Sequence, residues 1–124
     1  LKNYVPQFAD RPLYEERRWG KYCVMARASY ADGYKYLTKT LLLYPGKNIS
    51  YQVHGHRDEV WTFVDGEGLL VLDGVVRKVS RGDVVHIAKG HKHALRAITE
   101  LQLVEVQTGD LLEETDITRF PWEW

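Results

Sequence analysis

The stretch SYQVHGHRDE, residues 50–59, joins a β-rich run to the densest group of polar, metal-binding side chains in the chain. In an extended strand alternate side chains share one face, so Gln52, His54 and His56 are expected to point together. An unpaired polar group inside a protein costs on the order of 1–3 kcal/mol, and a metal ion is one way to satisfy several of them. A turn over Gly55 to Asp58 then allows Glu59 to begin the next strand facing the same interior.

Short β-rich runs separated by tight turns surround this stretch, from residue 34 to residue 107. Dipeptides such as Pro45-Gly46 and Asp73-Gly74 have the chemistry of tight turns. The runs predict strands near residues 34–44, 48–56, 59–65, 68–72, 75–79, 84–88, 92–98 and 101–107. Because no run sustains a 3.6-residue apolar period, the pattern predicts an all-β sandwich, jelly roll or barrel.

The two ends of the chain differ from this central region. Residues 1–18 hold two prolines and many charges, which indicates an irregular N-terminal arm. Residues 110–124 form a C-terminal tail that carries Trp122 and Trp124. Exposed tryptophans at a chain end would be costly, so we expect the tail to pack on the barrel or on a partner subunit. The sequence contains no linker or repeat and predicts a single domain over residues 1–124.

Composition limits the partners and the compartment. The 124 residues include 17 basic and 17 acidic side chains, so no overall field favours nucleic acid or an anionic membrane. The single cysteine cannot form an internal disulfide. There is no apolar run of about 20 residues and no signal-peptide pattern. These features predict a cytoplasmic protein that binds no nucleic acid and no membrane.

The spacing around the opening stretch resembles the first motif of the cupins, G-(x)5-H-x-H-(x)3–4-E-(x)6-G. This motif is matched in order by Gly46, Gln52, His54, Glu59 and Gly66. The single departure is Gln52, which stands where most cupins have their first histidine. The resemblance implies a cupin double-stranded β-helix, that is, a jelly-roll barrel.

A second polar cluster, GHKH at residues 90–93, resembles the second cupin motif, G-(x)5-P-x-G-(x)2-H-(x)3-N. Gly82, Gly90 and His93 match it, while Ala88 replaces the proline and Ala97 the asparagine. Together the two motifs imply one divalent metal ion. The ligands that they imply are Gln52, His54, Glu59 and His93.

An amide oxygen, two imidazoles and a carboxylate suit zinc, and manganese, iron, cobalt or nickel are tolerated alternatives. Each ligand also has a structural interpretation, such as a hydrogen-bonded core histidine or an ion pair of Glu59 with Arg57 or Lys92. His56 leaves three interpretations open: a ligand in place of Gln52, a group that contacts a ligand, or a free proton carrier.

Longer segments, residues 17–22, 45–61 and 104–120, resemble the type II mannose-6-phosphate isomerase domain. Its signature Q-x-H-x-H-R-x-E is present at residues 52–59. Three positions depart from the family pattern: Arg18 replaces proline, Leu111 replaces tyrosine and Thr115 replaces aspartate.

The resemblance implies a metal-dependent aldose–ketose isomerase that interconverts mannose 6-phosphate and fructose 6-phosphate. The base that moves the proton is expected to be His56, Glu105 or Lys39. Arg57 and Arg119 are the expected phosphate ligands, since guanidinium binds phosphate in a bidentate fashion. Structural roles remain open for these residues too, among them ion pairs of the arginines with nearby carboxylates and a hydrogen-bonded strand position for Glu105.

Other functions compete with isomerisation. One alternative is a non-catalytic cupin that binds a sugar or a sugar phosphate. Another is an accessory partner of a sugar-nucleotide biosynthesis enzyme. The ligand set disfavours a dioxygenase, which needs three histidines or a facial triad with three open positions. The family domain often follows a nucleotidyltransferase, but this sequence has no suitable glycine-rich phosphate loop, so guanylyltransferase activity is not expected. We expect a homodimer that buries the aromatic tail.

Overall fold

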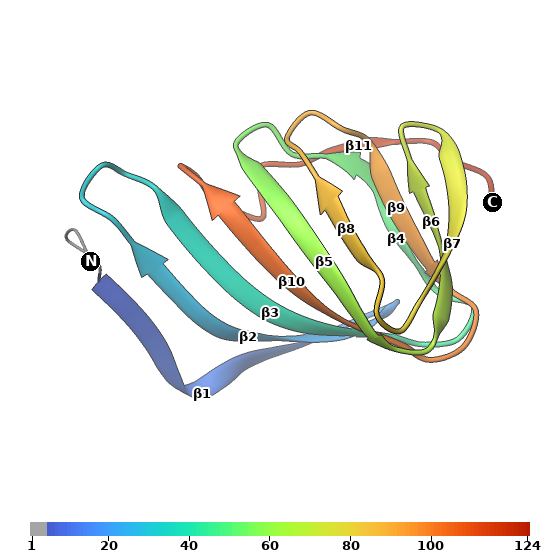
Figure 1. Ribbon diagram of the computed structural model, residues 1–124, viewed down its shortest axis with the longest axis horizontal. Helices are drawn as coiled ribbons and strands as arrows, with labels where there is room; N and C mark the ends of the chain where they lie inside the picture. Colours follow the sequence, from blue (N-terminus) through green and yellow to red (C-terminus); the bar gives the residue numbers. More distant parts are fainter. Residues whose placement is uncertain (1–4) are drawn as a thin grey trace.

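The computed structural model describes the backbone of residues 5–124 and the side chains from residue 14 onward (Figure 1). The described residues form eleven strands and no helix, which confirms the all-β prediction. The strands are β1 (Val5–Arg17), β2 (Gly20–Ser29), β3 (Lys35–Leu43), β4 (Asn48–Val53), β5 (Arg57–Asp65), β6 (Glu67–Leu72), β7 (Val75–Ser80), β8 (Val84–Ile87), β9 (His93–Ala97), β10 (Leu101–Gly109) and β11 (Thr118–Phe120). Consequently, the part of the chain that the structure describes offers no helix capable of crossing a membrane.

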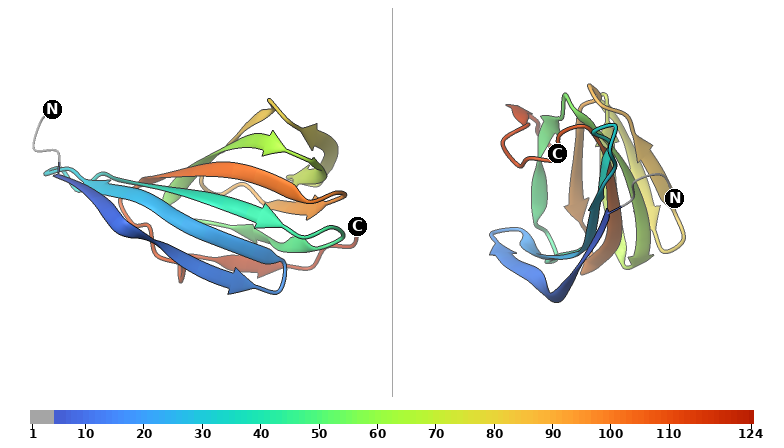
Figure 2. Two further views of the ribbon diagram at one scale, coloured as in Figure 1. Left: turned by 90° about the horizontal axis from the view of Figure 1, so that it is seen from below. Right: turned by 90° about the vertical axis from the view of Figure 1, so that its left-hand side faces the viewer.

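The strands build two antiparallel sheets that face each other, as the two views of Figure 2 show. One sheet has the order β1-β2-β3-β10-β5-β8 and the other β11-β4-β9-β6-β7. Strands distant in sequence are neighbours, with β10 lying between β3 and β5. This arrangement is a jelly-roll sandwich, in agreement with the predicted cupin fold.

The interior changes from apolar to polar along β5 and β10, two neighbouring strands of the larger sheet. Phe63 of β5 and Leu103 of β10 are register partners and belong to the main hydrophobic cluster. Closer to the other end of the same strands, the inward positions are Glu59 and Glu105. Burying the apolar side chains contributes about 1.5–3 kcal/mol each. The apolar end of the interior therefore holds the two sheets together, and the candidate functional side chains lie at the polar end.

The N-terminal segment differs from its prediction. Residues 5–17 form β1, which pairs with β2 as the edge strand of its sheet, whereas the sequence indicates an irregular lead-in. The irregular lead-in is expected because Pro6 and Pro12 cannot donate a backbone hydrogen bond to a neighbouring strand. An edge strand is hydrogen-bonded on one side only, so proline is tolerated there. Residues 1–4 of the predicted arm lie outside the described residues.

The C-terminal tail packs on the barrel, one of its two expected positions. β11 pairs with β4, and the Trp122 ring centroid lies 5.1 Å from that of Tyr51. Phe120 contacts the same tyrosine edge-on at 6.4 Å. Most of the aromatic surface that suggested a dimer is thus covered by the chain's own barrel.

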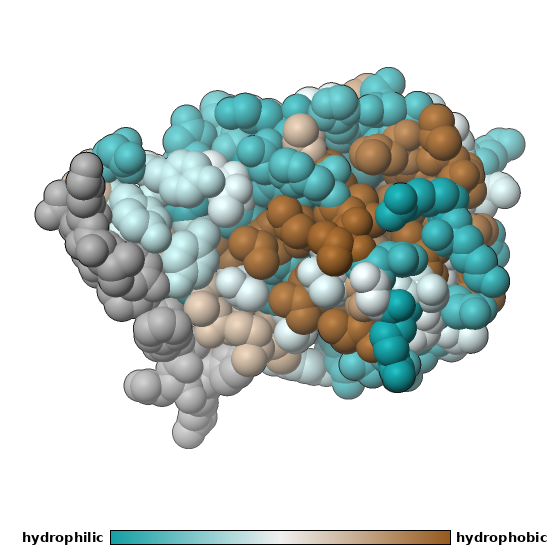
Figure 3. All heavy atoms as spheres, viewed as in Figure 1, coloured by the Kyte–Doolittle hydropathy of each residue, from teal (hydrophilic) through white to brown (hydrophobic). Residues whose placement is uncertain are grey.

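A different apolar surface remains exposed. Figure 3 shows apolar residues gathered over much of the face that Figure 1 presents. Val75 of β7 and Val84 of β8 are 69% and 60% exposed, and both border the same hollow. Each lies on the edge strand of its sheet. This surface is available to the second copy in the predicted homodimer.

Candidate metal centre

Three of the four predicted ligands converge at the polar end of the barrel. One ligand atom from each of His54, Glu59 and His93 lies within 4.8 Å of the others. His54 follows the last residue of β4, Glu59 lies in β5 and His93 begins β9. All three side chains are buried. The motif spacing therefore brings together groups from both sheets.

Both histidines are oriented by hydrogen bonds from one ring nitrogen. Nδ1 of His54 lies 2.7 Å from the carbonyl oxygen of Asp116, and Nδ1 of His93 lies 3.0 Å from that of His91. A neutral ring that donates from Nδ1 keeps a lone pair on Nε2, and metal-binding histidines are held in this way. Among the described residues, buried Nε2 of His93 has no hydrogen-bond partner. The residues present therefore fit a divalent ion.

The protonation of the two histidines also suits metal binding. Burial lowers the pKa of His93 to about 4. Burial, together with the positive charge of Arg57, lowers the pKa of His54. Both rings are neutral at pH 7, which is the state that coordinates a metal.

Arg57 lies inside the barrel and contacts the predicted ligands directly. Its side chain is 4% exposed. Its Nε donates to Oε2 of Glu59 at 2.8 Å, and its Nη2 lies 3.2 Å from Nε2 of His54. The structure thus contains the ion pair with Glu59 that the sequence left open. An ion bound at His54 would displace the Nη2 contact.

Gln52 lies beside the three-residue cluster. It is the register partner of His93 across β4 and β9, and it is partly buried. Its Oε1 accepts a hydrogen bond from Oγ of Ser50 at 3.4 Å. Its role as the fourth ligand stays a prediction.

His56 does not share the interior with His54, contrary to the strand-face expectation. Its side chain is 53% exposed, and Nδ1 lies 3.4 Å from a carboxylate oxygen of Asp110. β4 ends at residue 53, so the alternation of side chains stops before His54. The Asp116 carboxylate fixes the turn by accepting hydrogen bonds from the backbone N–H groups of Gly55 and His56 at 3.0 and 2.9 Å.

Two buried carboxylates are linked through one indole. Nε1 of Trp61 lies 3.0 Å from Oε1 of Glu59 and 3.0 Å from Oε1 of Glu105. Gln107 donates to the other oxygen of Glu105 at 3.1 Å. Burial, reinforced by the negative charge of Glu59, raises the pKa of Glu105 to about 7. Glu105 is therefore poised to accept and release a proton near neutral pH.

Lys39 forms ion pairs with Glu105 and with Glu114 of the C-terminal tail. Its Nζ lies 3.5 Å from Glu105 and 3.2 Å from Glu114, and 4.4 Å from the centre of the Tyr22 ring. Burial tends to lower the pKa of Lys39, but the charges of Glu105 and Glu114 outweigh burial and raise it. The side chain is therefore an ammonium at pH 7.

The first part of the C-terminal tail crosses this end of the barrel. The backbone oxygen of Glu113 lies 3.4 Å from Nη1 of Arg57, Glu114 contacts Lys39, and the Asp116 carbonyl holds His54. Sequence reasoning did not assign Glu114, Asp116 or Trp61 to the site. The inward parity of Trp61 in β5 could have identified it, whereas the tail contacts have no local sequence signal.

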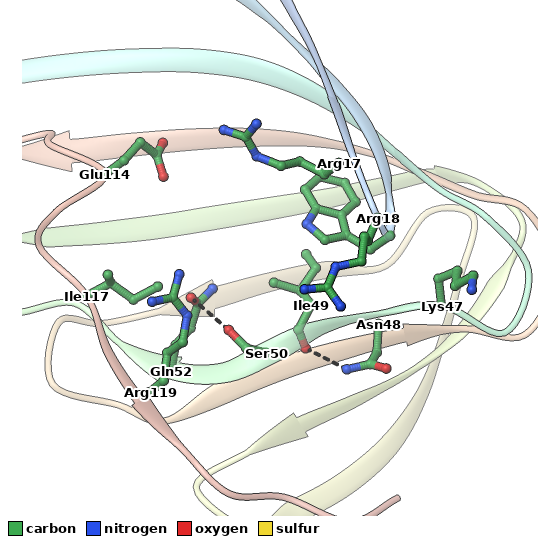
Figure 4. Close-up of a pocket in the computed structure, with 11 residues that line it drawn as sticks. Arg17, Arg18, Lys47, Asn48, Ile49, Ser50, Gln52, Glu114, Ile117 and Arg119 are labelled. Carbon is green, nitrogen blue, oxygen red and sulfur yellow. Dashed lines mark hydrogen bonds between the residues drawn. The ribbon is translucent and has the colours of Figure 1, made fainter.

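A cavity of about 510 Å³ opens next to Gln52, between the turn that joins β1 to β2 and the strand β4 (Figure 4). Arg119, one of the predicted phosphate ligands, lines this cavity, and Arg57 does not. Arg119 is the register partner of Gln52 across β11 and β4. Gln52 therefore borders the cavity and is also the register partner of His93 on the neighbouring strand.

Comparison with known proteins gives a consistent match. Residues 10–121 match the family model described as mannose-6-phosphate isomerase C-terminal. A mannose-1-phosphate guanylyltransferase of Salmonella montevideo is 36% identical over 122 residues, which cover 97% of this chain and 24% of that protein. The enzyme of the same name from Escherichia coli K12 is 35% identical over 106 residues, covering 84% of this chain and 21% of that one. The chain thus spans a quarter or less of the length of these two relatives.

Solved structures support the fold. An RmlC-like cupin from Shewanella frigidimarina superposes with a TM-score of 0.71 at 16% identity, covering 91% of this chain and 97% of the other. At this identity the similarity shows the cupin fold alone.

Proposed function

This chain belongs to the family of mannose-6-phosphate isomerase C-terminal domains, and we propose on that basis that it is a metal-dependent aldose–ketose isomerase of a sugar phosphate. The expected reaction interconverts mannose 6-phosphate and fructose 6-phosphate. The observation that carries the proposal is Glu105, a buried carboxylate with a pKa of about 7 linked through Trp61 to Glu59. Proton transfer between two carbons needs a base of this kind.

The predicted ligands Gln52, His54, Glu59 and His93 would hold the ion, and zinc is the ion that this donor set suits best. When bound, such an ion polarises the carbonyl and hydroxyl oxygens of the sugar and stabilises the negative charge that develops on them.

Glu105 is the proposed base. It takes the proton from C2 of the aldose and returns it to C1 to give the ketose, while the sugar hydroxyl proton moves from O2 to O1. Its burial favours this role over His56, whose side chain is 53% exposed. Lys39 is the positioning residue, because its ammonium lies 3.5 Å from the carboxylate and stays charged.

A second candidate function is non-catalytic binding of a sugar phosphate. The observation that favours it is the Arg57 contact, since the guanidinium lies 3.2 Å from the lone-pair nitrogen of His54 that an ion would use. A protein that keeps the substrate cavity but rarely holds a metal ion would bind the sugar phosphate without converting it. The related role of an accessory partner to a sugar-nucleotide enzyme is a proposal of the same kind.

A coupled assay separates the two functions. The zinc-loaded protein is incubated with mannose 6-phosphate, and fructose 6-phosphate is consumed by a coupling enzyme. We expect turnover that chelation abolishes and that Glu105→Gln lowers by about 100-fold or more. His56→Gln is the matched control and should keep its rate. Failure of the zinc-bound protein to turn over any sugar phosphate would rule out the isomerase and leave the binding function.

A further inference from the structure

The cavity beside Gln52 carries an excess of positive charge. Four of its lining residues are cations, Arg17, Arg18, Lys47 and Arg119, whereas the lining includes a single carboxylate, Glu114. The whole chain has no net charge, so this local excess is not a consequence of composition. Cations gathered in a concave surface create a field that attracts anions.

The partners of these side chains divide the cations into two groups. Nη2 of Arg17 lies 2.5 Å from Glu15, which neutralises it. The side chains of Arg18, Lys47 and Arg119 form no hydrogen bond or ion pair with any other residue that the structure describes. The sole carboxylate of the lining, Glu114, is bound to Lys39 at 3.2 Å. Three cations of the cavity are therefore left without a counter-charge.

The geometry points to a phosphate site: we propose that Arg18, Lys47 and Arg119 bind the phosphate group of the sugar phosphate. In the view of Figure 4 the guanidinium groups of Arg18 and Arg119 lie on either side of Ser50. Two guanidinium groups and an ammonium supply the planar and point donors that phosphate accepts. The volume of about 510 Å³ is in the range of small-molecule sites.

This assignment changes one of the two phosphate ligands expected from the sequence. Arg57 is buried on Glu59 and does not reach the cavity lining, so Arg18 and Lys47 take its place. Arg18 stands where the family pattern has proline.

The site also fixes the direction in which the substrate lies, a point that rests on the proposed function. Gln52 lines the cavity and pairs with His93 across β4 and β9. With the phosphate at the three cations, the carbonyl end of the sugar reaches Gln52 and the candidate metal centre. Ser50, which also lines the cavity, is available to the sugar hydroxyls.

Calorimetric titration with inorganic phosphate tests the site independently of turnover. The variant Arg18→Ala/Lys47→Ala is compared with Arg77→Ala/Lys89→Ala, which removes the same two charge types from exposed positions outside the cavity. Removing each charge-assisted hydrogen bond to phosphate is expected to raise the dissociation constant by about tenfold. The control pair should change it by less than about twofold. Metal-free protein is used, so phosphate cannot bind an ion.

The outcomes are distinct from those of the isomerase assay. Loss of phosphate binding in the cavity variant alone supports the site even where no turnover is found. Equal dissociation constants in the two double variants, or no phosphate binding by the unaltered protein, would overturn it. Where turnover exists, the KM for mannose 6-phosphate should rise in the cavity variant, and an unchanged KM would refute the site while the isomerase stands. Unchanged urea midpoints establish that both variants are folded.

Discussion

Replacing His93 by glutamine is expected to change how the stability of the metal-free protein depends on pH. Burial lowers the pKa of His93 from 6.5 to about 4. The unfolded chain therefore binds a proton in a pH range where the folded protein does not. Because protonation then favours the unfolded chain, the free energy of unfolding falls as pH decreases from 6.5 to 4. At 1.36 kcal/mol per pKa unit, the loss is roughly 3 kcal/mol.

Glu105 acts in the opposite direction. Its pKa is raised from 4.5 to about 7, so the folded protein binds this proton before the unfolded chain does. The stability from Glu105 is fully present below pH 4.5 and is lost as pH rises through 7, again by roughly 3 kcal/mol. In the unaltered protein the pH-dependent contributions of His93 and Glu105 to the free energy of unfolding nearly cancel. Glutamine cannot be protonated, so in His93→Gln the contribution of Glu105 is no longer opposed.

Urea unfolding of the metal-free proteins at pH 7, 5.5 and 4, followed by tryptophan fluorescence, measures this difference. Relative to the unaltered protein, His93→Gln should gain about 3 kcal/mol of stability between pH 7 and pH 4. His91→Gln is the matched control, because that side chain is half-exposed and pairs with Asp73 at the surface. The control should follow the unaltered protein to within about 1 kcal/mol. Parallel pH profiles for His93→Gln and the unaltered protein would refute the reasoning.

Other predictions concern the turn, the tail and the surface. A Cβ on Gly109 would lie 2.1 Å from the His56 carbonyl oxygen, so Gly109→Ala should lower urea stability by about 2 kcal/mol or more. A Cβ on Gly55 would lie 3.5 Å from Oδ1 of Asp116, which is an ordinary contact. Gly55→Ala should therefore lower the free energy of unfolding by less than about 1 kcal/mol. Trp122→Ala should lower stability by about 2–3 kcal/mol and speed proteolysis of the tail, and equal cleavage would contradict its docking. Val75→Lys with Val84→Lys should convert the predicted homodimer to a monomer in light scattering, and an unchanged dimer mass would exclude this surface.

Much of the fold was predictable because its signals are local. Alternating apolar residues and glycine turns give strand positions, and each predicted run overlaps an observed strand. The motif spacing predicts that Glu59 faces inward at the start of a new strand, and it does. The same parity rule places Arg57 two residues earlier on the same buried face. That local signal was available, yet the sequence interpretation assigned Arg57 to phosphate, because guanidinium binds phosphate in a bidentate fashion.

What could not be predicted depends on contacts between distant residues. His56 leaves the interior because Asp116, sixty residues later, fixes the turn before it. The pKa of Glu105 depends first on its burial and then on the charges of Glu59 and Lys39, which only folding brings together. The first strand was missed for a different reason, since proline indicates a break except where a strand is hydrogen-bonded on one side only.

Metal analysis of the purified protein tests the candidate metal centre most directly. After equilibration with zinc and removal of free ion, the unaltered protein should retain about one zinc per chain. His93→Ala should retain less than about a tenth of this amount, because it removes the buried imidazole whose Nε2 has no other partner among the described residues. His91→Ala keeps the carbonyl that orients His93 and should bind zinc normally. A folded unaltered protein that retains no ion, or equal zinc in His93→Ala, would contradict the account.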